Sequence, residues 1–187
     1  MITVAGGDSH VWGSELADSP HGGSNGYSRN TFTALLAGPN YTCVAYPGLG
    51  NREIAHRVID ACTPLVKSEL NLIVVVCWSW PARDSKLDSD DEVLELQNFL
   101  ELYRIPYLFT CVDNCMITDN PKINWKQWYL FPSGTEPGDT LQPRGFYQWA
   151  IENKYIVGVD GHPLEDAHKD AATLIKEKFD EMVKKHY

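Results

Sequence analysis

The chain has 187 residues, with 25 acidic residues against 16 lysines and arginines, which gives a formal net charge of −9. This length suits one domain with a full hydrophobic core, and the acidic balance argues against a nucleic-acid partner, because phosphate backbones attract basic surfaces. The apolar run at 70–80 is too short to span a membrane, and the N-terminus has no leader-like segment, so we expect a cytoplasmic protein without a membrane partner.

The first half of the chain alternates apolar, strand-like runs with helical patterns. A Gly/Ser-rich loop is expected at 20–26, after the first run. The run at 72–78 is continuous and rich in Val, which is typical of a central parallel strand buried on both faces. The expected elements are strands at 2–5, 41–46 and 72–78 and helices at 28–36 and 52–61.

The second half continues the alternation, with one long interruption. We expect helices from the acidic stretch 88–92 to about 102 and at 164–185, and strands at 105–111 and 155–159. The segment at about 112–153 is rich in Trp, Phe, Tyr, Pro and Gly and is expected to form a loop-rich insertion over the sheet's edge. Its aromatic side chains suit packing under a long loop, and binding of a sugar or an acyl chain is the alternative.

This order predicts one α/β domain over residues 1–187, a three-layer α/β/α sandwich around a central parallel sheet of about five strands. The loops that follow the first, second, third and fifth strands should share one edge of the sheet, where ligands bind in such folds. Those loops contain, in order, Ser9, Gly48, Ser79 and His162.

The five cysteines form an odd set, and three of them lie in apolar, strand-like runs, which favours reduced and mostly buried thiols: Cys43, Cys62, Cys77, Cys111 and Cys115 are the full set. Cys111 and Cys115 have no second Cys/His pair at ligand spacing, so a structural metal is not expected.

Two short motifs at opposite ends of the chain are suited to nucleophilic catalysis. Gly6-Gly7-Asp8-Ser9 follows the first strand and either forms a plain turn or presents the Ser hydroxyl at the sheet edge. Asp160-Gly161-His162-Pro163 precedes the last helix and places a carboxylate beside an imidazole. A serine nucleophile needs a base and a group that orients the base, so Ser9, His162 and Asp160 are candidates for these three roles.

Together with Tyr46-Pro47-Gly48-Leu49-Gly50-Asn51, these motifs resemble the sequence blocks of the SGNH hydrolases, also called GDSL-type lipases and esterases. The resemblance covers nearly the whole chain and is similar in arrangement to compact phage-encoded or bacterial cytosolic members. It implies a flavodoxin-like sandwich, with Ser9 as nucleophile, His162 as base and Asp160 as its orienting acid. The backbone N–H groups of Ser9 and Gly48, with Gly50 as the second choice to Gly48, would form the oxyanion hole.

The chain departs from the family pattern at two places. The third block, Gly-x-Asn-Asp, is replaced by residues 76–84, which contain no Asn, so Ser79 or Arg83 is expected to contact the oxyanion or the substrate there, with Asn51 as a further binding candidate. The usual Asp-x-x-His is shortened to Asp-x-His, and His168, three residues after Glu165, is therefore a rival base.

The resemblance implies a serine esterase that hydrolyses a small acyl ester, such as an O-acetyl carbohydrate, through an acyl-enzyme, with no metal or organic cofactor. Two alternatives stay open at this stage. The same serine would serve an acyltransferase, and the altered third block is also compatible with a weak or inactive protein that binds ligands or assists assembly.

Overall fold

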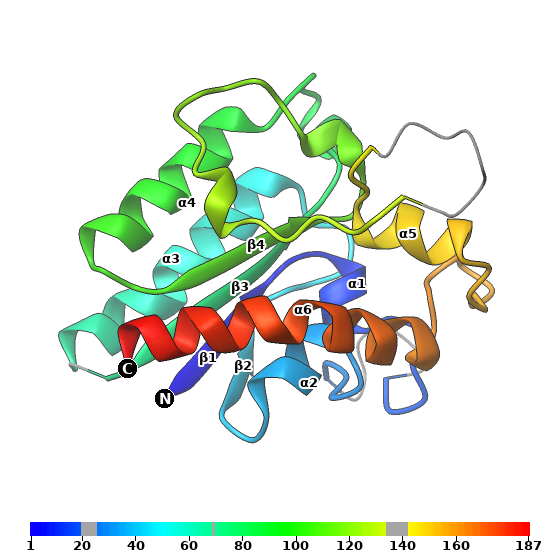
Figure 1. Cartoon of the computed structure of the whole chain (residues 1–187), viewed down its shortest axis with the longest axis horizontal. Coiled ribbons are helices and arrows are strands. Elements are labelled where there is room, and N and C mark those ends of the chain that lie inside the picture. Colours follow the sequence, from blue (N-terminus) through cyan, green and yellow to red (C-terminus); the bar gives the residue numbers. More distant parts are fainter. Residues whose placement is uncertain (20–25, 69, 134–141) are drawn as a thin grey trace.

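A parallel sheet of four strands runs through the middle of the described part of the chain (Figure 1). The computed structural model describes residues 1–19, 26–68, 70–133 and 142–187. The strands are β1 (Ile2–Gly6), β2 (Tyr41–Cys43), β3 (Leu72–Trp78) and β4 (Tyr107–Cys111), in the spatial order β2-β1-β3-β4. Val4 pairs with Thr42 on one side and with Val74 on the other, which places β1 and β3 in the centre.

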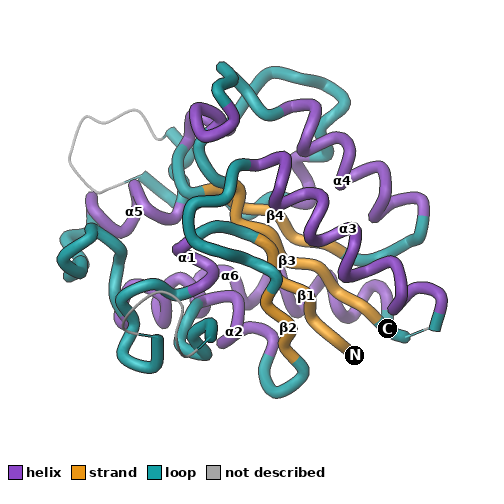
Figure 2. Tube along the Cα trace, turned by 180° about the vertical axis from the view of Figure 1, so that it is seen from behind, coloured by secondary structure: helices purple, strands orange, loops and turns teal. Residues whose placement is uncertain are grey.

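Helices cover both faces of this sheet and make a three-layer sandwich (Figures 1 and 2). One face carries α3 (Asn51–Lys67) and α4 (Asp90–Leu102), and the other carries α2 (Phe32–Ala37) and α6 (Glu165–His186). The short helices α1 (Ser9–Trp12) and α5 (Phe146–Glu152) lie near the carboxyl ends of the strands. Among these described helices, none has the length and apolar character needed to cross a lipid bilayer.

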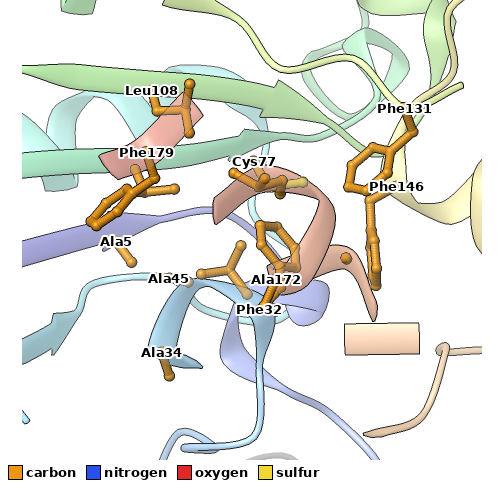
Figure 3. Packing of buried hydrophobic residues seen from close by; sticks show 14 of the residues in the cluster. Ala5, Phe32, Ala34, Ala45, Cys77, Leu108, Phe131, Phe146, Ala172 and Phe179 are labelled. Atoms are coloured by element: carbon orange, nitrogen blue, oxygen red, sulfur yellow. The ribbon is translucent and has the colours of Figure 1, made fainter. Parts of the chain in front are cut away.

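The alternation of side chains along β1 and β3 explains the two cores. Ala5, Val75 and Cys77 belong to the cluster under α2 and α6, whereas Val4, Val74 and Val76 belong to the cluster under α3 and α4. Successive strand residues point to opposite faces, so a run that is apolar at every position fills both layers. Figure 3 shows part of the first cluster, where Cys77 of the sheet lies with Phe32 and Ala172 of the helices.

The expected fifth strand at 155–159 is wrong, because this segment is a loop outside the sheet. Its one ladder contact is a bridge between Val157 and Pro163, and Val159 is fully exposed. The free edge of β4 is occupied instead by the aromatic segment: Trp128 forms a bridge with Phe109, and the N–H of the next residue bonds the Phe109 carbonyl at 2.8 Å. The edge where a fifth strand would pair is thus already covered.

Most other elements lie where the sequence placed them, with shifts at their ends. Helix α2 begins at Phe32 rather than at residue 28, because the Thr31 side chain caps it by accepting from the N–H of Ala34 at 3.3 Å. Helix α3 continues past Pro64, and its last turn packs on the core. The expected loop at 20–26 falls outside the described residues except for Gly26.

The insertion at 112–153 contains two 3₁₀ turns, Asn114–Met116 and Trp125–Gln127, followed later by α5. Residues 134–141 of it lie outside the described part of the chain. Its described aromatic side chains are mostly buried in the two cores, as expected for packing under a long loop: Trp128, Phe131, Phe146 and Trp149. Tyr147 is only partly buried and lies at the carboxyl end of the sheet.

The strand order creates a crevice between the loops that follow β1 and β3. From β1 the chain goes outward to β2, and it then returns to β3 and continues outward on the other side to β4. The two central loops therefore leave the sheet in opposite directions, and ligands of open α/β sheets bind at this switch point.

The buried face of α4 provides a test of the packing. Leu96 is completely buried in the core, whereas Leu102 on the same helix is 75% exposed. We expect Leu96→Ala to lower the free energy of unfolding by about 2–5 kcal/mol, because it removes buried methyl groups and leaves a cavity. The matched control Leu102→Ala should change it by less than about 0.5 kcal/mol. Urea denaturation measures both, and equal losses would contradict the assigned face of α4.

Candidate active site

Ser9 lies at the carboxyl end of β1, at the first position of α1, and is 5% exposed. Gly7 makes this turn: a Cβ atom there would collide with the side chain of Val11. Asp8 caps α1 and accepts a hydrogen bond from the backbone N–H of His10 at 3.0 Å. The expected turn is therefore present, and it places Ser9 at the carboxyl end of β1.

His162 is held by a carboxylate that comes from the N-terminal part of the chain. Its Nδ1 lies 2.8 Å from Oε2 of Glu15, and its backbone N–H donates to the same oxygen at 3.2 Å. The backbone N–H of Asp160 donates to Oε1 of Glu15 at 2.9 Å, and a Cβ atom on Gly158 would collide with this carboxylate. The loop 158–162 thus encloses the Glu15 side chain.

Glu15, and not Asp160, is the partner of the His162 imidazole. The Asp160 side chain is exposed, and this residue contributes only its backbone N–H, which donates to Glu15. The sequence analysis missed Glu15 because it lies in no recognised motif and adopts the left-handed backbone conformation, with φ of 68°. The only signal in the sequence is an acidic residue shortly after Ser9.

Glu15 is ionised near neutral pH. Burial by itself raises the pKa of this carboxyl, but the hydrogen bonds from the backbone of Asp160 and from His162 outweigh it and lower the pKa. A carboxylate accepts only, so Nδ1 of His162 carries a proton, and in the neutral imidazole Nε2 has a free lone pair. This is the tautomer that a general base needs.

His162 is connected with the segment around Ser9 by two separate contacts. Glu15, which binds His162, follows Ser9 closely in the chain, and the ring of His10, the next residue after Ser9, lies 5.3 Å from the His162 ring. Within the described residues the Ser9 hydroxyl forms no hydrogen bond, either with His162 or with another group. Bonds between nucleophile and base are often long without substrate and tighten when it is bound.

The rival base, His168, is a structural residue of α6. It is 1% exposed, its Nδ1 accepts the backbone N–H of Phe32 at 3.2 Å, and its ring stacks on Phe32. Burial, followed by repulsion from His10 and His162, lowers its pKa to about 3, so it stays neutral. His168 therefore connects α6 with α2, and it is not positioned to exchange protons with Ser9.

Asp8 connects the loops after β1 and β3. It is completely buried, and besides the backbone of His10 its carboxylate contacts Nδ1 of His10 at 3.0 Å and the Ser79 hydroxyl at 2.8 Å. The Arg83 guanidinium lies 3.5 Å away. Burial raises the pKa of Asp8, but the attraction and hydrogen bonds of His10, helped by Arg83, lower it to about 2.

Ser79 and Asn51 hold the loop after β3 in place, and the polar hydrogens of their side chains are engaged in hydrogen bonds. The Ser79 hydroxyl donates to Asp8, and its backbone N–H donates to Oδ1 of Asn51 at 2.7 Å. The Asn51 amide donates to the Ser79 carbonyl and to the Ser89 hydroxyl, each at 2.8 Å. Neither expected side-chain donor is therefore free for an oxyanion.

The two backbone donors expected for the oxyanion hole, Ser9 and Gly48, belong to the loops after β1 and β2. The N–H groups of Ser9 and Gly48 donate no hydrogen bond within the described residues, and the space beside Gly48 is open. Gly50, the second choice, packs against the carboxylate of Asp84, whose negative charge would repel an oxyanion. Of the two glycines, Gly48 is therefore the one without a carboxylate packed against it.

Arg83 lies between the same loops. Its guanidinium donates to the Leu49 carbonyl at 3.3 Å, lies 3.5 Å from Asp8 and sits over the Trp80 ring, with 28% of the side chain exposed. A partly exposed cation at this position suits contact with a negatively charged group of a ligand.

Among the described residues, no three His, Cys, Asp or Glu side chains are grouped so that they could hold a metal ion. In comparisons with protein-family models and with curated proteins, nothing matched this sequence. The site is therefore interpreted from its own geometry: a buried serine, an imidazole oriented by an ionised carboxylate, and two unpaired backbone donors.

The low pKa of Asp8 predicts part of the acid sensitivity of the fold. Because this pKa is about 2 in the folded protein against 3.8 ordinarily, ionised Asp8 stabilises the fold above about pH 4. This contribution, about 2 kcal/mol, is lost as the pH falls through about 2. We expect the free energy of unfolding to fall by about 2 kcal/mol less in Asp8→Asn than in the wild type between pH 5 and pH 2. Denaturant titrations at each pH measure this, and identical pH slopes would refute it.

Proposed function

We propose that this protein is a serine esterase of the SGNH type, which hydrolyses a small acyl ester, such as an O-acetyl group on a carbohydrate, through an acyl-enzyme. The observation that carries the proposal is the hydrogen bond between ionised Glu15 and Nδ1 of His162, next to the segment that displays Ser9. A carboxylate that fixes one imidazole nitrogen leaves the other as a base for a serine hydroxyl.

Acylation begins when Ser9 Oγ attacks the carbonyl carbon of the ester and His162 Nε2 takes the hydroxyl proton. The carbonyl oxygen becomes an oxyanion, which the N–H groups of Ser9 and Gly48 stabilise. The intermediate then expels the alcohol, whose oxygen receives the proton from His162. Glu15 stays ionised and stabilises the imidazolium between these two transfers.

Deacylation repeats these transfers with water. His162 removes a proton from the water as its oxygen attacks the acyl carbon, and the same proton returns to Ser9 Oγ when the acid leaves. The acyl group thus departs as a carboxylic acid and the serine is restored. An acceptor alcohol in place of water would make the protein an acyltransferase with the same residues.

The oxyanion hole of this proposal has two backbone donors and no side-chain amide. One such donor contributes roughly 3 kcal/mol, or about a hundredfold in rate. The side chains of Ser79 and Asn51 are hydrogen-bonded elsewhere, so they do not replace it. The lack of a side-chain amide in the oxyanion hole favours the second candidate, a binding or assembly protein of low activity. The Ser9 hydroxyl, which has no hydrogen bond within the described residues, favours it too.

Labelling with a fluorophosphonate separates the two candidates. We expect the wild type to be labelled and to hydrolyse p-nitrophenyl acetate, and Ser9→Ala to lose both properties, because the attacking oxygen is removed. Ser14→Ala is the matched control, since Ser14 is also buried and belongs to the same segment, and it should be labelled. Intact mass spectrometry reads the adduct. A folded wild type that neither labels nor hydrolyses the ester would favour the binding protein.

Exchange of each acidic residue for its amide identifies the orienting group. We expect Glu15→Gln to lower kcat/KM on the order of a thousandfold, because the neutral amide no longer fixes the base tautomer. Asp160→Asn should change kcat/KM by less than about twofold, since its side chain is exposed and only its backbone is used. Ester hydrolysis measures both, with thermal melting as a folding control. The reverse ranking would restore Asp160 as the orienting acid.

A further inference from the structure

His10, the residue after Ser9, presents an imidazole nitrogen without a partner. Its Nδ1 lies 3.0 Å from Oδ1 of Asp8, which is completely buried. Because Asp8 is ionised, Nδ1 of His10 donates to it, and in the neutral imidazole Nε2 is left as an acceptor. This Nε2 atom is buried and has no hydrogen-bond partner among the described residues.

The surroundings of His10 do not satisfy that nitrogen. Four rings pack around the imidazole with centroids 5.3 Å to 6.1 Å away, those of His162, Tyr147, Trp80 and Phe146. Buried polar atoms nearly always have a partner, and an orphan in a folded protein calls for an explanation such as a bound group. A donor supplied by a ligand would complete this position.

The place of His10 indicates which half of a substrate supplies the donor. In the proposed reaction His162 hands its proton to the oxygen of the leaving alcohol, and the His10 ring lies directly against His162. The oxyanion donor Gly48 belongs to the loop after β2, whereas Trp80 follows β3 and Tyr147 belongs to α5. His10 therefore borders the region of the departing alcohol.

Trp80 and Tyr147 are partly exposed and pack against the ring of the buried His10, so we expect a ligand to reach Nε2 by displacing one of these rings. Aromatic rings with a nearby polar group suit a ligand that has apolar faces and hydroxyl edges. A sugar or another polyhydroxylated alcohol has this chemistry.

We propose that His10 is a specificity-determining residue whose Nε2 accepts a hydrogen bond from a hydroxyl in the alcohol half of the ester, which selects esters of sugars and other polyhydroxylated alcohols. The inference rests on the proposed esterase function. It assigns the alcohol half of the substrate and leaves the acyl half to the rest of the site.

A pair of isosteric esters tests this: 2-hydroxyethyl acetate, which has the hydroxyl, and propyl acetate, which has a methyl group in its place. Each kcat/KM is divided by the rate of hydroxide hydrolysis of the same ester, so that intrinsic reactivity cancels. We expect the wild type to prefer the hydroxyl ester by about tenfold, the usual effect of one hydrogen bond.

Two substitutions of His10 distinguish the roles of its two ring nitrogens. His10→Asn keeps an N–H where Nδ1 contacts Asp8 and removes Nε2, so it should abolish the preference, measured as the ratio of the two kcat/KM values. His10→Gln places an amide oxygen at the position of Nε2, so it should retain the preference even if both rates fall. The matched control His56→Asn changes a half-exposed histidine on α3 and should leave both rates unchanged.

The outcomes are distinguishable. Loss of the preference in His10→Asn with retention in His10→Gln supports the proposal. A wild type without preference, or equal losses on both esters in His10→Asn, overturns it and leaves the esterase function standing. A folded wild type that hydrolyses neither ester and takes no fluorophosphonate label overturns the proposed function, and the inference about His10 falls with it.

Discussion

The buried carboxylate of Asp8 is the interaction on which the organisation of the site depends. It caps α1, which sets the position of Ser9, and it binds the Ser79 hydroxyl across the switch point of the sheet. A buried charge without partners would be costly, so the groups around Asp8 are held in place by the need to satisfy it. The loops after β1 and β3 are thereby fixed relative to each other, and Asn51 extends the same network to the start of α3.

Ser9 is flanked by two carboxylate–imidazole pairs with different surroundings. The Glu15–His162 pair is partly exposed and belongs to loops, which suits a base that must meet a substrate. The Asp8–His10 pair is almost completely buried beside it. The rings of the two histidines touch edge to face, so any group that reaches one of them also comes close to the other. The division of labour proposed above, proton transfer for His162 and recognition for His10, follows from this difference in exposure.

The architecture could be predicted from the sequence because its signal is spread over many residues. The Val-rich run of β3 and the helical spacing of α3 and α6 each fix an element, and their alternation fixes the parallel sheet and the edge at which Ser9 lies. The fifth strand could not be excluded in this way, since the competition for the edge of β4 was decided by Trp128, far away in the sequence. Local pattern carries no information about such long-range competition.

The positions of Ser9 and His162 in the candidate site could be predicted from the sequence, but the carboxylate that contacts the His162 imidazole could not. Ser9 and His162 lie next to strand ends and helix starts, which periodicity locates, whereas the role of Glu15 depends on a single left-handed residue and on the path of a distant loop. The hydrogen bonds that occupy the side chains of Ser79 and Asn51 could not be predicted either, because only the folded structure shows their partners.

The enclosure of Glu15 by the loop 158–162 joins the two ends of the chain. Three hydrogen bonds to one side chain hold this loop, which precedes the last helix, against the segment that follows β1. The contact that orients the imidazole is therefore also a long-range tertiary contact, and it forms only when the C-terminal part of the chain has docked. A chain in which the C-terminal part has not docked would lack this contact, and the segment around Ser9 would have no imidazole from the loop 158–162 beside it.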